Sequence, residues 1–163
     1  MKKILIFLLL ATMVLSLVAC KNNDNPPAEE GKIYTFTSGT TKIAIDADAA
    51  PILASLGQWR DYAESTSCAF EGLDKVYTYA GFEIQTYPMG EKDFVYMVIL
   101  QDDTVATEKG IRIGSAKDAI TAAYGTPDEE TATALTYQGK GMYLQFLLRD
   151  GAVTSIQYCK QEA

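Results

Sequence analysis

The residue types that usually carry catalysis are scarce in this chain. Its 163 residues include no histidine, which removes the usual general base, the Ser-His and Cys-His nucleophile pairs and the commonest zinc ligand. Ser115 stands two positions before Lys117, so the pair lacks the S-x-x-K spacing of penicillin-recognising enzymes, and no glycine-rich phosphate loop is present. The sequence therefore predicts a protein that is not an enzyme and uses no cofactor.

Three acidic clusters are the remaining candidates for chemistry. They lie at residues 29–30, 102–103 and 128–130, and such carboxylates could bind calcium or act as a glycosidase pair. None has the spacing of a calcium-binding loop, so solvated turns are the favoured interpretation and no metal site is predicted. A cell-wall hydrolase that uses Asp102 or Asp103 stays a secondary hypothesis.

The start of the chain has the pattern of an export signal. Lys2 and Lys3 precede an uncharged apolar run over residues 4–18, which is typical of a secretory signal peptide. The run ends in Leu-Val-Ala-Cys, which resembles the lipobox of bacterial lipoproteins. This resemblance implies cleavage after residue 19, a diacylglycerol on the thiol of Cys20 and an acyl chain such as palmitate on its amine. An ordinary signal peptide or membrane anchor that happens to contain a cysteine is the alternative.

The segment after Cys20 is predicted to be a flexible tether. Residues 20–32 contain a proline pair and no apolar residue able to join a core. Without Lys2 and Lys3, 12 basic side chains face 21 acidic ones, a net charge near −9. Such a surface repels nucleic acid. The expected partners are therefore the cell membrane, through the lipid on its extracytoplasmic side, and an envelope protein or wall polymer.

Residues 110–127 read as a strand followed by a helix. Ile111 and Ile113 alternate with a polar residue, as in a short half-buried strand, and Ser115 has the S-x-x-D spacing of a helix start. A helix over residues 116–124 should then end at Gly125.

Part of this pattern occurs a second time upstream. A shift of 68 positions gives five identities at apolar or turn positions. The pairs are Ile43 with Ile111, Ile45 with Ile113, Ile52 with Ile120, Ala54 with Ala122, and Gly57 with Gly125. We interpret them as an internal repeat, with a first copy and its N-terminal hairpin over residues 33–109 and a shorter copy over residues 110–163. Two unrelated segments rich in Ile, Ala and Gly are the alternative.

The remaining elements follow from alternation and turn residues. A hairpin is expected over residues 33–45, a helix from Asp46 or Asp48 to Leu56, and a second short helix near residues 60–64. Six strands are expected at residues 75–79, 82–87, 94–100, 134–137, 142–148 and 153–159. The predicted class is α+β, with two tandem repeats of a helix and an antiparallel meander that form a sheet with helices packed on one face.

Tyrosines and cysteines supply the candidate site residues. Tyr on an open sheet face suits recognition, and the chain has ten tyrosines. The candidate binding face comprises Tyr77, Tyr79, Tyr87, Tyr96 and Tyr143. The alternative is that Tyr simply favours strands and borders cores. Cys68 and Cys159 either form one disulfide that closes a loop of about 90 residues or remain buried thiols.

Two sequence motifs resemble those of known protein families. They are I-x-I-G-S-x-K-D-x-x-x-x-x-Y-G-x-P at residues 111–127 and CAFEGLDKVYTY at residues 68–79. With the tandem units, they resemble the β-lactamase inhibitory protein fold, the small lipoproteins of outer-membrane assembly and tandem-repeat lipoproteins of Gram-positive bacteria. The inhibitor grips its enzyme with a concave sheet and a hairpin, and disulfides brace each unit. Neither unit here contains a cysteine pair, so that bracing does not carry over.

The resemblance implies a function in the cell envelope. The expected function is a non-catalytic binding or scaffolding module, and inhibition of a cell-wall or β-lactamase-type enzyme is the alternative, by analogy of fold alone.

Overall fold

The computed structural model describes residues 31–161. The predicted signal peptide, Cys20 and most of the predicted tether lie outside the described residues. Within them, strands account for 49% of the residues and helices for 12%. The first strands, β1 (Thr35–Ser38) and β2 (Thr41–Ala44), form a small antiparallel hairpin of their own, as the alternation around residues 33–45 predicted.

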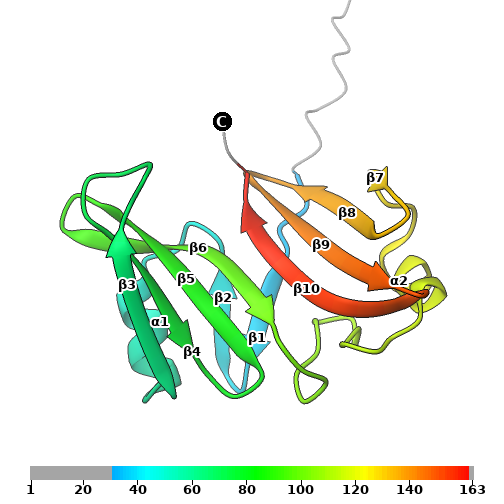
Figure 1. Cartoon of the computed structure of the whole chain (residues 1–163), viewed down its shortest axis with the longest axis horizontal. Helices are drawn as coiled ribbons and strands as arrows, with labels where there is room; N and C mark the ends of the chain where they lie inside the picture. The colour runs from blue at the N-terminus through cyan, green and yellow to red at the C-terminus, as the bar shows by residue number, and fades with distance from the viewer. Residues whose placement is uncertain (1–30, 162–163) are drawn as a thin grey trace, which may run out of the picture.

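A single antiparallel sheet of eight strands dominates the molecule (Figure 1). Its strands are β3 (Asp61–Thr66), β4 (Leu73–Thr78), β5 (Phe82–Met89), β6 (Lys92–Leu100), β7 (Glu129–Glu130), β8 (Ala134–Gly139), β9 (Met142–Arg149) and β10 (Ala152–Lys160). The order across the sheet is β3-β4-β5-β6-β10-β9-β8-β7. Two four-strand meanders therefore meet at one seam, where Leu100 of β6 pairs with Ile156 of β10.

The alternation of side chains gives this sheet two different faces. In β9, Leu144 and Phe146 are buried on one face, whereas Tyr143 and Gln145 are half-buried on the other. The hairpin β1–β2, the two helices and the segment between β6 and the second helix lie behind the first face in Figure 1, and Phe36 and Ile43 of the hairpin join its core. We call this side the covered face and the other side the open face.

Both helices are short and end alike. α1 (Ala49–Leu56) begins after Asp48, whose side chain accepts a hydrogen bond of 3.1 Å from the Ala50 amide, as predicted. α2 (Lys117–Tyr124) ends at Gly125, also as predicted. Its expected serine cap is wrong, because the Ser115 hydroxyl instead accepts a hydrogen bond of 3.1 Å from the Arg112 amide.

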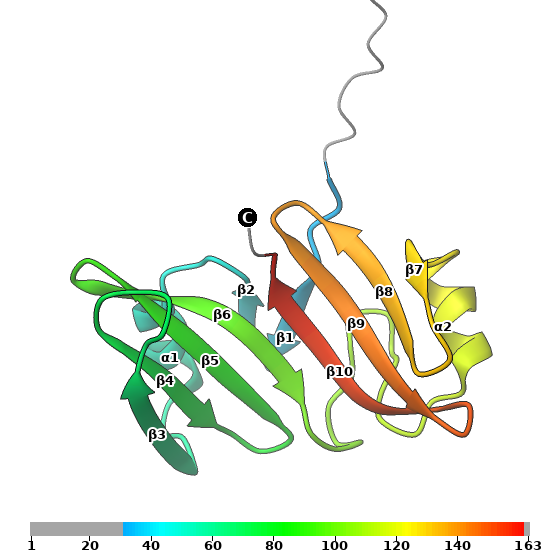
Figure 2. The ribbon, with the colours of Figure 1, turned by 45° about the horizontal axis from the view of Figure 1, so that its top comes forward.

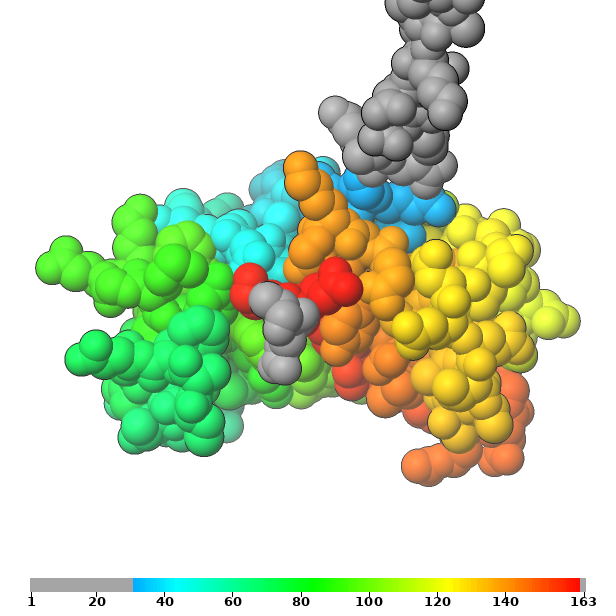
Figure 3. Space-filling model, turned by 90° about the horizontal axis from the view of Figure 1, so that it is seen from above, coloured from blue at the N-terminus to red at the C-terminus, as the bar shows by residue number. Residues whose placement is uncertain are grey.

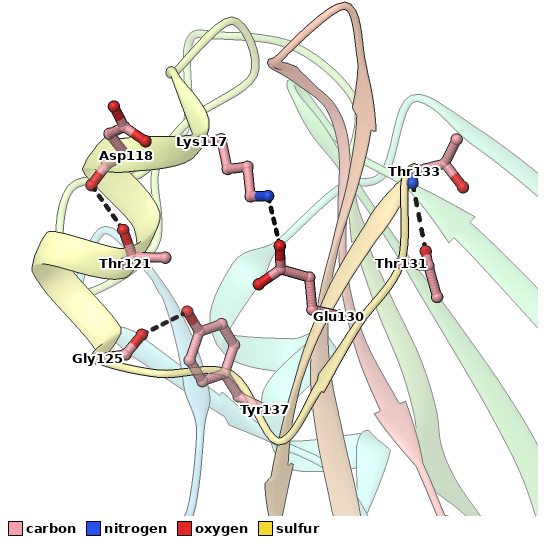
Figure 4. Close-up of polar contacts among 8 residues, drawn as sticks. All are labelled: Lys117, Asp118, Thr121, Gly125, Glu130, Thr131, Thr133 and Tyr137. Atoms are coloured by element: carbon pink, nitrogen blue, oxygen red, sulfur yellow. Dashed lines mark hydrogen bonds and ion pairs between the residues drawn. The ribbon is translucent and has the colours of Figure 1, made fainter.

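Polar contacts fix α2 to the edge of the sheet (Figure 4). The Lys117 ammonium lies 2.6 Å from a carboxylate oxygen of Glu130 in β7, and the Tyr137 hydroxyl of β8 donates a hydrogen bond of 3.0 Å to the carbonyl of Gly125. The two ends of the helix are thereby held against the last strands of the sheet.

The α+β class predicted from the sequence is wrong, because the fold is mostly β. Each helix has eight residues, and the side chains fully buried are Ala49 and Ile52 in α1 and Ile120 in α2. The helices are therefore too small to form the predicted layer on one face of the sheet. The β1–β2 hairpin and the segment around Ile111 supply much of the cover instead.

Two local predictions failed as well. The short helix expected near residues 60–64 is the edge strand β3, which pairs with β4 along its whole length. Helix-forming residues such as Ala63 and Glu64 lose here to tertiary pairing. The strand expected at residues 111–113 is a loop, in which Ile111 is buried against the core. Its alternation reflects packing of a loop rather than strand pairing.

Candidate binding surface

The open face carries half-buried apolar and amide side chains side by side. Pairing across the seam aligns Gln157 of β10 with Ile99 of β6, and pairing within the second meander aligns Gln157 with Gln145 of β9. Neighbouring side chains hold these amides in place. The Gln157 amide donates a hydrogen bond of 3.2 Å to the Ser155 hydroxyl, and the Gln145 amide donates one of 3.1 Å to the Thr136 hydroxyl. An amide side chain has further hydrogen-bonding capacity beyond one such bond. The face therefore combines apolar area with ordered polar groups.

A β-bulge shapes the open face in the first meander. The register between β5 and β6 shifts once, so that Val95 pairs with Thr86 but Met97 pairs with Gln85. Tyr96 is thus the extra residue of a bulge, a feature that re-aims a side chain. In the structure, the Tyr96 ring lies 6.2 Å from the Tyr87 ring in an edge-on arrangement.

A cavity of about 600 Å³ opens at this place. We call it the open-face cavity. Its floor is formed by Val76 of β4, Gln85 and Tyr87 of β5 and Tyr96 of β6, and its wall by residues 67–70 of the β3–β4 loop. In Figure 2, this loop passes in front of the strands. The volume is within the range of pockets that hold a small molecule or an anchoring side chain.

Two aromatic rings, one from the wall and one from the floor, lie close together in the cavity. The Phe70 ring, which comes from the loop, lies 4.7 Å from the Tyr87 ring. Phe70 is 37% exposed, whereas Tyr87 is 3% exposed. The exposed ring therefore stands over a buried one, and an apolar group that entered the cavity would contact both.

A polar cluster ties the cavity to the C-terminal end of the sheet. The Lys160 ammonium lies 2.7 Å from both carboxylate oxygens of Asp46, and the Tyr87 hydroxyl donates a hydrogen bond of 2.9 Å to one of them. Burial, and then the bond to Asp46, raise the pKa of Tyr87. Burial alone would lower the pKa of Lys160, but Asp46 holds it above its usual value. The end of β10 that carries Lys160 lies between the two halves of the molecule (Figure 3).

The five predicted tyrosines do not form one surface. Tyr87 and Tyr96 line the open-face cavity, and Tyr143 lies on the open face of β9, opposite Cys159. Tyr77 and Tyr79 belong to the core on the covered side, each 7% exposed. For these two, the alternative interpretation of a tyrosine that borders the core holds.

Sequence reasoning did not single out Phe70 and Lys160, which line the cavity, or the contact of Lys160 with Asp46. Phe70 lies in a loop without periodicity, and the contact between Asp46 and Lys160 joins residues 114 positions apart. Neither gives a local signal. Lys160 is the last residue of β10, and nothing in the sequence indicates its partner.

The two cysteines that follow the tether are separate free thiols in the structure. Cys68 lies exposed in the β3–β4 loop at the open-face cavity, and Cys159 is buried in β10. Burial raises the pKa of the Cys159 thiol, although a hydrogen bond with Tyr143 partly opposes the shift. Of the two alternatives, the disulfide is not formed in this structure, and only Cys159 is a buried thiol.

Among the acidic candidates for chemistry, Asp102 makes a local structural contact, and residues 29–30 lie outside the described residues. The Asp102 carboxylate accepts a hydrogen bond of 2.8 Å from the Thr104 amide and another from the Thr104 hydroxyl, which lower its pKa. Neither it nor Asp103 lines the open-face cavity. Over residues 31–161, no group of three or more His, Cys, Asp or Glu side chains is placed to hold a metal ion. The same residues contain no helix long and apolar enough to cross a membrane.

Comparison with known proteins adds no family to this description. No protein-family model, no curated protein and no solved structure matches the chain.

Proposed function

We propose that this chain is a lipid-anchored binding module on the extracytoplasmic side of a bacterial cell membrane. It holds a partner protein of the envelope on its open sheet face and catalyses no reaction. The observation that carries this proposal is the open-face cavity, where an exposed Phe70 ring stands over a buried Tyr87 ring on an uncovered sheet. Exposed aromatic side chains beside a pocket are typical of the central anchors of protein interfaces.

The chemistry of the face favours a polypeptide as the partner. Partly exposed Met97 and Ile99 alternate on the open face with amides that are already held by neighbours, such as Gln157. This arrangement resembles an interface with an apolar centre and a polar rim. In the proposed complex, one apolar side chain of the partner enters the open-face cavity, and partner backbone groups meet the amides.

The net negative charge of the chain favours a partner with a basic surface. The chain beyond Lys3 has 12 basic and 21 acidic side chains. A basic surface patch on the partner would therefore speed association, and added salt would slow it. The expected partner is an envelope protein with an apolar side chain on a basic surface.

The anchor part of the proposal rests on the apolar run and on Cys20. Cells grown with radioactive palmitate should label the wild-type chain and the Cys68→Ser variant. The Cys20→Ser variant should not be labelled. Label that persists in Cys20→Ser, or a wild-type chain without label, would exclude this anchor.

The binding part is tested by photocrosslinking in intact cells. A photoreactive residue at Gln157 on the open face should give a discrete adduct with one envelope protein. The same residue at Ala122, an exposed position of α2 on the opposite side, should not give that adduct. An adduct from Ala122 alone, or equal adducts from both positions, would place the contact elsewhere.

A further inference from the structure

A second cavity lies on the covered side of the sheet, away from the open-face cavity. It has a volume of about 420 Å³ and is formed by residues 32–35, by Glu108 and Lys109 of the turn before α2, by Tyr124 of α2 and by Tyr158 of β10. We call it the N-terminal cavity. Four separate segments of the chain therefore line it.

Tyrosine rings form much of its wall. The Tyr34 and Tyr124 rings have centroids 6.1 Å apart and are tilted by 56°. Tyr158 is nearly fully buried at 2% exposure and lines the same cavity. Ring faces of this kind pack against the C–H groups of a ligand as well as against apolar side chains.

The Tyr158 hydroxyl is buried without a hydrogen-bond partner among the residues that the structure describes. A buried polar group without a partner costs folding free energy. Burial raises the pKa of Tyr158, and the neighbouring Tyr124 and Glu108 raise it further. Tyr158 itself lines the N-terminal cavity, so a ligand that enters this cavity is the partner to be tested for its hydroxyl.

The other polar groups of the cavity include both donors and acceptors. Glu108 accepts a hydrogen bond of 2.6 Å from Thr35 through one carboxylate oxygen. The Lys109 ammonium donates a hydrogen bond of 2.8 Å to the Ala123 carbonyl and lies 4.6 Å from the centre of the Tyr124 ring. A carboxylate has acceptor sites, and an ammonium has donor sites, beyond a single bond.

We infer that the N-terminal cavity binds a neutral, polyhydroxylated ligand about the size of one sugar unit. Hydroxyl groups can accept from Tyr158 and Lys109 and donate to Glu108, while the C–H face of the ligand packs on Tyr34 or Tyr124. An anion would meet the Glu108 carboxylate, and a cation would meet the ammonium groups of Lys32 and Lys109. A neutral ligand with many hydroxyls avoids both conflicts.

The test uses the full chain, purified in a detergent without a sugar headgroup. Methyl α-D-glucoside and N-acetylglucosamine are titrated at millimolar concentration, and NMR follows the tyrosine ring signals. At least one sugar should shift the Tyr34, Tyr124 and Tyr158 signals saturably. Inorganic phosphate and tetramethylammonium should not do so. Failure of both sugars, or tighter binding of either ion at these residues, overturns the inference.

The structure offers a matched control for the hydroxyl. Tyr79 also has a buried hydroxyl without a partner among the described residues, but it lines neither cavity. Tyr158→Phe should weaken sugar binding about five- to tenfold, the size expected for one hydrogen bond. Tyr79→Phe removes the same kind of group and should leave binding within about twofold of wild type. Equal binding by the two variants overturns the inference, and it does so whether or not the open face binds a partner.

Discussion

Asp46 combines an unfavourable backbone conformation with favourable side-chain contacts. It has a φ of 62°, in the left-handed region, which costs most side chains about 1–2 kcal/mol and is tolerated best by Gly, Asn and Asp. Its carboxylate compensates by binding both Lys160 and Tyr87. An aspartate is therefore suited to this position both by its backbone tolerance and by its charge.

Because the backbone conformation and the charge of Asp46 contribute separately, two substitutions should have different effects on stability. Asp46→Asn keeps the left-handed tolerance and an acceptor for Tyr87, so it should lose less than about 1 kcal/mol, the usual worth of an exposed ion pair. Asp46→Ala also adds the backbone cost and should lose about 1–2 kcal/mol more. Urea unfolding measures both. Equal destabilisation by the two variants would contradict the assignment.

The two thiols should differ in reactivity. Cys68 is exposed, whereas the buried Cys159 has a raised pKa and so little reactive thiolate. A thiol reagent such as Ellman's reagent should therefore modify Cys68 in the folded protein, and Cys159 only after unfolding. Cys68→Ser should abolish the early reaction. If neither thiol reacts until a reductant is added, the two are bridged and the free thiols of the structure are wrong.

At the scale of elements, the two meanders share contacts at corresponding positions. In the first half, the Asp46 amide donates a hydrogen bond of 2.9 Å to the Val95 carbonyl. In the second half, the Gly114 amide donates one of 2.8 Å to the Val153 carbonyl. Asp46 and Gly114 are separated by the same 68 positions as the sequence identities, and both have positive φ. These contacts support the proposal that residues 33–109 and 110–163 are copies of one unit.

The glycines that end the two helices should stabilise the fold through their backbone conformation. Gly57 has φ 76° and ψ −150°, and Gly125 has φ 84° and ψ −158°, a region that is essentially restricted to glycine. A Cβ would meet no atom within 4 Å at either position, so the cost of alanine is conformational alone. Gly57→Ala and Gly125→Ala should each lose about 1–3 kcal/mol.

The neighbouring exposed residue Gln58 is the control for this measurement. Gln58→Ala should change the free energy of unfolding by no more than about 0.5 kcal/mol. A Gly57→Ala variant as stable as Gln58→Ala, measured in urea, would show that the helix ends do not need the glycine conformation.

The elements that the sequence predicted correctly are those with local signals. The alternation of residues 142–148 predicted β9, and Asp48 and Gly57 predicted the limits of α1. The errors arose where partners decide the structure. β3 depends on its pairing with β4, and the bulge at Tyr96 depends on the pairing of β6 with β5, so neither has a local signal.

The candidate site was predictable only in part for the same reason. Tyr87 and Tyr96 were singled out as tyrosines in strands, and both line the open-face cavity. Tyr77 has the same local pattern but lies on the covered face, and composition cannot tell the two faces apart when both contain aromatic residues. Phe70 enters the cavity from a loop, which no periodicity describes.

The whole molecule should lose stability in alkali. Burial raises the pKa of Tyr137 to about 12 and also raises that of Tyr158, while an unfolded tyrosine ionises near pH 10. Between these values the unfolded chain has lost protons that the folded chain keeps, so the free energy of unfolding falls as the pH rises. The stabilising contribution is complete below about pH 10 and is lost progressively up to about pH 12.

Urea midpoints measured from pH 8 to pH 12 check this expectation. The wild-type midpoint should be flat to about pH 10 and then fall, and Tyr137→Phe should reduce the slope of that fall. A midpoint unchanged up to pH 12, or an equal slope in the variant, would show that Tyr137 is not held neutral by burial.

The central claim is that the open-face cavity receives a side chain of a partner protein, and two residues of one hairpin test it most directly. Phe70 and Leu73 are 37% and 38% exposed, but of the two only Phe70 lines the open-face cavity. With a photoreactive residue at Gln157, adduct yield in intact cells should fall strongly in Phe70→Ala, because loss of a central anchor weakens binding by about 30-fold. It should stay near the wild-type yield in Leu73→Ala. Equal yields from the two variants would contradict the account.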